Sequence, residues 1–260
     1  MASDDTRDPK ERFSSRVELY RRYRPGYPEG LIEVLRRRCG LAASWDVADV
    51  GSGTGILAGL FLKNGNRVFG VEPNGPMRAA GEETLRGYRS FVSVEGSAEN
   101  TTLRGESVDL ISAGQAFHWF DRERAREEFR RVLRPGGWVA LVWNDRRTEA
   151  TPFLRDYEDL LRRHGTDYGK VDHKNVGRPA LDAFFGPGAW TLDVVENRQE
   201  FGLDGLVGRL LSSSYVPAQG EPGCQAMLEE VERIYHEHAR NGAVAFEYDC
   251  QVYAGRLENP

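Results

Sequence analysis

Residues 47–56 read VADVGSGTGI, an apolar run that passes directly into a turn rich in glycine. The run 47–50 is typical of a buried strand, and the apolar residues that follow Gly55 favour a helix. Glycines between a strand and a helix let a ligand come close to the backbone, and they expose N–H groups where the helix begins. The stretch therefore predicts a strand, a ligand-binding turn and a helix in succession.

Strand and helix patterns alternate along the chain on both sides of this turn, up to about residue 144. Further strands are expected at 67–71, 91–94, 108–112 and 138–143, and helices at 16–24, 56–64, 76–86 and 121–133, with another helix starting near Pro28. Pro135-Gly136-Gly137 is expected to separate the last of these helices from the strand at 138–143. Such alternation favours a doubly wound, mostly parallel sheet that binds its ligand at the carboxyl ends of the strands.

The pattern changes after residue 145. Helices are expected at 153–164, 203–211 and 224–240, and two late strands at 191–201 and 244–257. These strands would complete a seven-stranded sheet as an antiparallel edge. The expected parts are a core with an N-terminal arm at 1–145, a helical substrate cap at 146–225, and a helix and strand at 226–260 that complete the core sheet.

The composition is that of an ordinary soluble globular protein, with 40% hydrophobic and 29% charged residues. A net charge of −5 gives no positive field that would attract nucleic acid, and no apolar run is long enough for a membrane helix. The charged first residues lack the apolar segment of a secretory signal. We therefore expect a cytoplasmic monomer or homodimer with no nucleic-acid or membrane partner.

Cysteines and histidines give no metal-ligand pattern. Cys39, Cys224 and Cys250 are scattered and form no CxxC pair. His236 and His238 stand two residues apart, so on a helix they point to different faces. The sequence predicts neither a metal site nor a disulfide framework.

Acidic residues follow the second and third expected strands. At Glu72 a carboxylate can accept both hydroxyls of a ribose, although a solvated loop glutamate is the alternative. Ala98 and Glu99 can meet the edge of a purine, although turn chemistry alone would also explain them. Ile56 stands where the GxGxxG turn of a dinucleotide site has its last glycine, which argues against a nicotinamide cofactor.

Four segments between about residues 47 and 142 carry a family resemblance through their order and spacing. They are DVGSGTG, VEPNGPM, EGSAENTTL and RVLRPGGWVAL. Together they resemble the class I S-adenosylmethionine (SAM) dependent methyltransferases. RYRPGYP and QAFHWFD resemble more narrowly the type 11, trans-aconitate-methyltransferase-like subgroup. LLSSSYVP and YDCQVYAGRL loosely resemble the cap and the last strand of that subgroup. The resemblance implies a Rossmann-like methyltransferase fold and SAM as the cofactor.

The resemblance also implies roles for single residues. Glu72 would hold the ribose hydroxyls, and the backbone of Gly51, Ser52 and Gly53 would run under the methionine and ribose portion. The remaining expected contacts are Pro73, Met77, Ala98 and Glu99 at the adenine, Gln115, Ala116 and His118 at the methyl-bearing end, and Tyr20 and Arg24 over the amino-acid end.

The expected reaction is transfer of the sulfonium methyl to a small-molecule acceptor, through a carboxylate or hydroxyl oxygen. Because the cation is already activated, alignment in a closed, dry site can supply most of the catalysis. His118 would position the acceptor, act as a base or merely pack against Trp119. A nicotinamide oxidoreductase and a non-catalytic SAM-binding protein are the alternatives, and the negative net charge disfavours methylation of RNA or protein.

Overall fold

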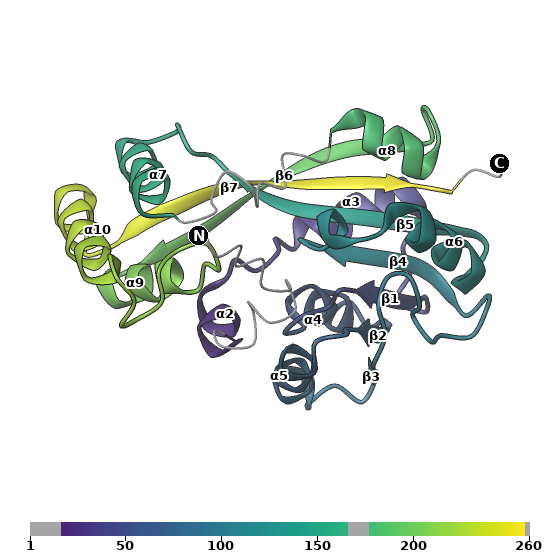
Figure 1. Ribbon diagram of the computed structural model, residues 1–260. Coiled ribbons are helices and arrows are strands. Elements are labelled where there is room, and N and C mark those ends of the chain that lie inside the picture. The colour runs from purple at the N-terminus through teal and green to yellow at the C-terminus, as the bar shows by residue number, and fades with distance from the viewer. Residues whose placement is uncertain (1–16, 166–176, 258–260) are drawn as a thin grey trace, which may run out of the picture.

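One sheet organises the computed structural model, which describes residues 17–165 and 177–257. In these residues seven strands pair in the order β3-β2-β1-β4-β5-β7-β6 (Figure 1). β1 to β5 run parallel, and β7 is antiparallel to both of its neighbours, so the expected mostly parallel sheet with an antiparallel edge is confirmed. The strands are β1 (Asp46–Val50), β2 (Arg67–Val71), β3 (Phe91–Val94), β4 (Val108–Gly114), β5 (Leu133–Arg146), β6 (Trp190–Phe201) and β7 (Val244–Gly255).

Helices cover both faces of this sheet. α3 (Gly30–Cys39) and α4 (Ile56–Lys63) pack on one face, and α6 (Arg122–Val132) and α8 (Arg178–Phe185) pack on the other. Successive strand residues supply the two cores in turn, because side chains alternate across a strand. The strand order reverses between β1 and β4, and parallel α/β sheets bind their ligands at the carboxyl ends of the strands beside such a reversal.

β5 begins at Leu133, whereas the sequence analysis placed its start at residue 138. Val108 of β4 pairs with Leu133, and Leu110 pairs with Trp138, so Pro135-Gly136-Gly137 bulges out between two pairs of one strand. The left-handed φ of +79° at Gly136 allows this bulge. The expected break is therefore a bulge inside the strand.

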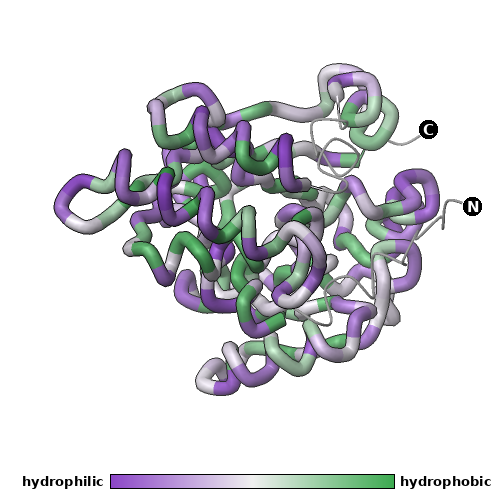
Figure 2. The backbone as a smooth tube through the Cα atoms, turned by 60° about the vertical axis from the view of Figure 1, so that its left-hand side comes forward, coloured by the Kyte–Doolittle hydropathy of each residue, from purple (hydrophilic) through white to green (hydrophobic). Residues whose placement is uncertain are grey.

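Three helices form a third hydrophobic core beside the sheet, and together they are called the cap below. They are α7 (Pro152–His164), α9 (Leu203–Leu211) and α10 (Cys224–His238). Phe246 and Tyr248, in the first half of β7, complete this core. Figure 2 shows hydrophilic and hydrophobic residues alternating along the helical turns of the chain. In α7, α9 and α10 the buried apolar residues recur at helical spacing and form one apolar side of each helix.

The β6–β7 pair connects the cap to the sheet (Figure 1). Its register runs without interruption from Trp190 opposite Gly255 to Phe201 opposite Val244. The expected division at 146–225 stays a proposal. β6 lies inside that range but belongs to the sheet, and most of α10 lies beyond it but packs in the cap.

The N-terminal arm reaches both parts of the molecule. Its helix α2 (Val17–Tyr23) contacts α9 in the cap and α5 (Gly75–Leu85) beside the sheet. The helix expected near Pro28 begins at Gly30. Within residues 17–165 and 177–257, no helix has both the length and the apolar character that crossing a membrane requires.

Candidate active site

The glycine turn after β1 is fixed against the end of β2. The N–H groups of Gly51 and Ser52 both donate to the Val71 carbonyl, at 2.9 and 3.1 Å. Gly51 and Gly53 have φ values of +70° and +54°, a region that favours glycine. A Cβ atom at Gly51 would stand 2.7 Å from the Cβ of Ala116 in the loop after β4. The backbone of the turn is therefore closely packed, and a larger residue at position 51 has no room.

The Glu72 carboxylate braces the same turn from the end of β2. One oxygen accepts the N–H of Gly53 at 2.8 Å, and the other accepts the N–H of Asn74 at 2.9 Å. The residue is only 8% exposed. Because a carboxylate can accept several hydrogen bonds, Glu72 is suited to bind a hydroxyl group of a ligand at this edge of the sheet.

The start of α5 lies next to the turn as well. Asn74 caps this helix by accepting the N–H of Met77 at 3.0 Å. The Met77 side chain is buried, and its Cε would stand 3.3 Å from a Cβ atom at Gly53. Pro73, between Glu72 and Asn74, is half-buried at the same edge. Met77 and Pro73 thus flank the glycine turn, and their role at an adenine stays a prediction.

Asp49, at the carboxyl end of β1, is a buried acid that the sequence analysis quoted only as part of a motif. Its Oδ1 accepts the Ser112 hydroxyl at 2.9 Å. Its Oδ2 is buried and makes no hydrogen bond of normal geometry among the described residues. Burial raises the pKa of this carboxyl to about 7, and the charge of Glu72 adds to the shift. Asp49 therefore offers an acceptor oxygen beside the glycine turn.

The loop after β4 carries the residues expected near a reacting group. Gln115 has a left-handed φ of +55°, an uncommon conformation for a residue with a side chain. Its N–H donates to the Val142 carbonyl at 2.9 Å, and its Nε2 donates to the Asn144 carbonyl at 3.3 Å. Non-glycine residues in this conformation are frequent at functional sites, since neighbouring contacts must hold them there.

The next residues form the short 3-10 helix η1 (Phe117–Trp119). Phe117 is fully buried, with its ring 4.7 Å from that of Phe184, so it packs in the core of the sheet. Trp119 is 40% exposed and does not share that role. The half-buried His118 ring lies 4.8 Å from the Trp119 ring, at an angle of 44°. This contact fits the packing alternative for His118 and also fits a positioning role.

Ala98 and Glu99 follow β3 in a small turn. Ala98 is 3% exposed and packs in the sheet core. The Glu99 carboxylate accepts the N–H of Asp121, the N-cap of α6, at 3.0 Å. Glu99 thus has a structural role at the start of α6, and its contact with an adenine stays a prediction.

The N-terminal arm places Arg24 beside the cap. Its Nη2 donates to the carbonyl of Ser212, just after α9, at 3.1 Å, and its Cζ lies 5.0 Å from the centre of the Tyr20 ring. The Gly26 carbonyl accepts the side-chain amides of Asn144 and Asn197, at 3.1 and 2.8 Å, which ties the arm to β5 and β6. Glu72, Met77 and Ala116 therefore meet the glycine turn. Arg24 instead lies against Tyr20 and the cap, and its carbonyl accepts the side-chain amide of Gln199 in β6 at 3.3 Å.

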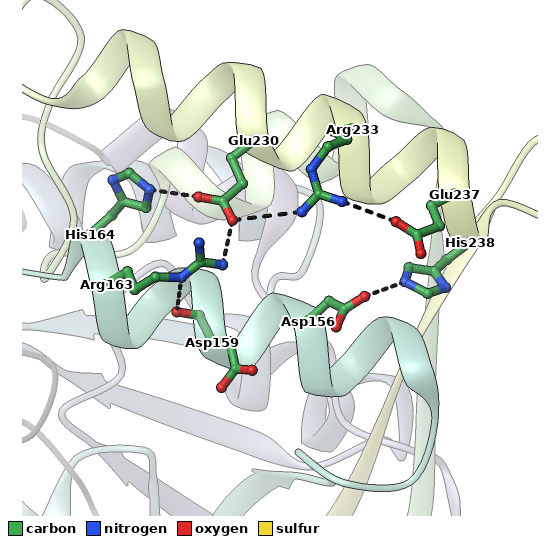
Figure 3. A network of polar contacts seen from close by, with 8 residues as sticks. All are labelled: Asp156, Asp159, Arg163, His164, Glu230, Arg233, Glu237 and His238. Atoms are coloured by element: carbon green, nitrogen blue, oxygen red, sulfur yellow. Dashed lines mark hydrogen bonds and ion pairs between the residues drawn. The ribbon is translucent and has the colours of Figure 1, made fainter.

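Asp156, Glu237 and His238 form a cluster of possible metal ligands in the cap. One ligand atom of each lies within 4.8 Å of the other two. In Figure 3 they belong to a network of ion pairs between α7 and α10, in which His238 Nε2 meets Asp156 Oδ2 at 2.6 Å and Arg233 Nη1 donates to Glu237 at 3.0 Å. The His238–Asp156 contact joins the two helices, the Arg233–Glu237 contact lies within α10, and the expectation of no metal site stays a prediction.

Comparison with known proteins agrees with this geometry. Residues 48–141 match the family described as a methyltransferase domain. An uncharacterized methyltransferase of Mycobacterium tuberculosis is 39% identical over 163 residues, which cover 61% of this chain and 62% of that protein. The match therefore spans less than two thirds of that relative.

Two solved structures share the fold. A protein named as a putative type II methyltransferase from Anaeromyxobacter dehalogenans has a TM-score of 0.72 and 25% identity, and the match covers 92% of this chain and 100% of that one. A protein named as a putative SAM-dependent methyltransferase from Methanococcus maripaludis has a TM-score of 0.54 and 19% identity, over 75% of this chain and 91% of that one. At 19% identity the second comparison shows the fold alone.

The residues around the glycine turn fit SAM. Asp49 Oδ2 is a buried acceptor that makes no hydrogen bond of normal geometry to the described residues, and the Glu72 carboxylate is held beside the turn by two backbone N–H groups. The positive φ values of Gly51 and Gly53 form a turn whose backbone a ligand can approach closely. The sheet order, this turn and the match over residues 48–141 thus give the chain the Rossmann-like fold of the class I methyltransferases, whose cofactor is S-adenosylmethionine.

Proposed function

We propose that this chain transfers a methyl group from SAM to a carboxylate or hydroxyl oxygen of a small molecule. The observation that carries the proposal is the Glu72 carboxylate, which is held by two backbone N–H groups beside the glycine turn at the end of β2. The RYRPGYP and QAFHWFD segments favour the trans-aconitate-methyltransferase-like subgroup within the class. We infer a cytoplasmic protein from the composition, which is that of an ordinary soluble globular protein, and we propose that it is a monomer or homodimer.

Different residues hold different parts of the cofactor. When bound, SAM supplies a methyl group on a sulfonium, which an acceptor oxygen displaces in line. Glu72 binds the ribose hydroxyls, and the backbone of Gly51, Ser52 and Gly53 lies under the sugar and the methionine. Asp49 accepts a hydrogen-bond donor of SAM beside the glycine turn, since its buried Oδ2 makes no hydrogen bond of normal geometry to the described residues. The adenine-side contacts are Pro73, Met77, Ala98 and Glu99.

The remaining residues orient the acceptor and exclude water. Gln115 and Ala116 border the methyl, because their loop packs directly on Gly51. His118 is held against Trp119 and presents its ring as a positioning group. A carboxylate acceptor needs no base, whereas a hydroxyl acceptor gives up a proton, which His118 would then accept. Tyr20 and Arg24 close the site from the N-terminal arm.

Methyl-labelled SAM, incubated with the protein and a cell extract, tests the proposal. Label that enters small molecules supports it, and mass spectrometry of the labelled fraction identifies the acceptor. Label in RNA or protein would contradict the small-molecule assignment. SAM binding without turnover would indicate a non-catalytic SAM-binding protein, and binding of NADH in place of SAM would indicate an oxidoreductase.

A further inference from the structure

Arg209 of α9 is a buried cation inside the cap. It is 5% exposed, and its Cζ lies 5.7 Å from the centre of the Phe246 ring. Its Nη1 donates to the Ser213 hydroxyl at 3.3 Å, while its Nε is buried and makes no hydrogen bond to the described residues. Within residues 17–165 and 177–257, no carboxylate forms an ion pair with it. A buried charge of this kind is costly unless an opposite charge compensates it.

A second arginine, Arg24, contacts the residues that directly follow α9. Arg24 donates to the carbonyl of Ser212, the neighbour of Ser213, and its own Nε is also buried without a hydrogen bond to the described residues. Burial, and then the charge of Arg209, lowers the pKa of Arg24. In the described part of the chain Arg24 likewise has no ion-paired carboxylate. Two guanidinium groups therefore converge on two consecutive residues.

The surrounding side chains supply aromatic rings and hydroxyls. The Tyr157 ring lies 4.8 Å from Phe246, and Arg146 of β5 lies over Tyr157 at 5.1 Å. Arg146 differs from the other two arginines, because it is paired with Glu158 of α7. Burial lowers the pKa of Arg209, but Tyr248, Tyr157 and Tyr215 raise it, and the net pKa lies above the ordinary value. These rings and hydroxyls stabilise the guanidinium, but as neutral groups they leave its positive charge without an ion-paired partner.

Tyr215 is the last residue of the Ser212–Tyr215 turn that follows α9, and its pKa indicates the positive potential of this region. Burial raises the pKa of Tyr215, but Arg24, Arg209 and Arg146 act in the opposite direction, and the net pKa lies below the ordinary value. A lowered pKa for a buried tyrosine means that the environment favours an anion.

Hydrogen bonds connect this region to the loop beside the glycine turn. Gln115 donates to the Asn144 carbonyl, and the Asn144 side chain donates to the carbonyl of Gly26, two residues beyond Arg24. Arg24 and Arg209 therefore lie where the N-terminal arm meets the cap, and Gln115 lies where the arm meets the sheet.

We propose that Arg209, together with the Ser212–Tyr215 turn, binds a carboxylate group of the methyl acceptor. Arg24 lies beside this site and keeps the place over the amino-acid end of SAM that the resemblance implies for it. The inference rests on the proposed function, and it adds the residues of the cap that hold an anionic acceptor. A guanidinium pairs with a carboxylate through two parallel N–H···O bonds, which supplies both charge compensation and orientation. An anchored carboxylate would orient the acceptor between the cap and the methyl-bearing end.

Calorimetry of the full chain, saturated with S-adenosylhomocysteine, tests this site. The probes are small mono-, di- and tricarboxylates, each paired with its neutral amide. At least one carboxylate should bind at least tenfold more tightly than its amide. Arg209→Gln should weaken this binding at least tenfold and Arg209→Lys by less, while the affinity for S-adenosylhomocysteine stays within about twofold of wild type. Arg233→Gln, an exposed arginine of the cap, is the matched control and should leave both affinities unchanged.

The outcomes separate the two proposals. No heat with S-adenosylhomocysteine would contradict the proposed function, whatever the carboxylates do. Cofactor binding without any preference for carboxylate over amide would overturn the anion site alone. A loss of S-adenosylhomocysteine affinity in Arg209→Gln would assign the cation to the cofactor carboxylate and also overturn the site. If Arg209→Gln fails to fold, the wild-type preference and the Arg209→Lys titration decide.

Discussion

The Tyr23 ring lies on Gly208 so closely that a Cβ atom at position 208 would stand 2.2 Å from Cε2 of the ring. Tyr23 ends α2, and Gly208 lies in the middle of α9. The contact docks the N-terminal arm on the cap, one residue before Arg24 and one residue before Arg209. Because Gly208 has no side chain, α2 can pack closely on α9, and this packing brings Arg24 and Arg209 near each other.

Gly208→Ala should push α2 away from α9. Overpacking of this kind costs about 1–3 kcal/mol, which denaturant unfolding would measure. Trypsin should cleave faster at the neighbouring Arg21 and Arg22, because the arm is less firmly held. Gly87→Ala is the matched control, since a Cβ atom there meets nothing within 4 Å. An unchanged cleavage rate in Gly208→Ala would show that this contact does not hold the arm.

SAM and S-adenosylhomocysteine should both raise the Tm. Ligand at about 100 times its Kd adds about 2.7 kcal/mol of stability when it binds only the folded state. Thermal unfolding at increasing ligand concentration checks this, with NADH as the control ligand. An unchanged Tm together with no heat in calorimetry would remove the basis for a SAM site at the glycine turn.

Glu72→Ala should weaken SAM binding by about 1.5–3 kcal/mol, the usual contribution of a hydrogen bond to a charged group. The variant also leaves the N–H groups of Gly53 and Asn74 without their acceptor, so its stability must be measured alongside. Glu95→Ala is a suitable control, because that side chain is 77% exposed. Wild-type affinity in Glu72→Ala would move the ribose contact to another residue.

Asp49 should make the ligand-free protein less stable as the pH rises. Burial raises its pKa from 3.8 to about 7, so the folded state prefers the protonated form. The stabilisation is complete below about pH 4 and is lost as the pH rises through about 7. Asp49→Asn should flatten this part of the pH profile of the unfolding free energy. An equally steep profile in the variant would assign the pH dependence to other groups.

His118→Ala should slow methyl transfer while SAM affinity changes little. A positioning role predicts a loss smaller than about 100-fold and a pH profile that keeps its shape, because general bases contribute about 100-fold or more. Initial rates between pH 5 and pH 9, at saturating SAM, separate the two roles. If the variant loses an acid limb that the wild type shows near about pH 6.5, the base role is correct.

Local patterns were enough to predict the cofactor half of the fold. The glycine turn, Glu72 and the loop at Gln115 each follow a strand directly, so their place at the sheet edge depends on neighbouring residues in the chain. The bulge at Pro135-Gly136-Gly137 was misread as a break, because its pairing with β4 depends on register between strands distant in sequence.

The cap could be predicted only in outline. The proximity of Arg24 and Arg209 arises from packing between α2 and α9, which no spacing in the sequence encodes. Likewise, Asp156 and His238 meet because α7 lies against α10, although the histidines alone gave no ligand pattern. Asp49 was visible in the sequence, but its burial and raised pKa depend on Ser112 and on the covering helices.

The place of β7 between β5 and β6 has a consequence for synthesis of the protein. β7 is the last strand in the chain, yet it separates two strands made earlier. During translation β5 therefore keeps an unpaired edge, and β6 has no partner, until residues 244–255 leave the ribosome. Open strand edges favour association with other chains, so the nascent protein is most prone to aggregate just before its final strand emerges.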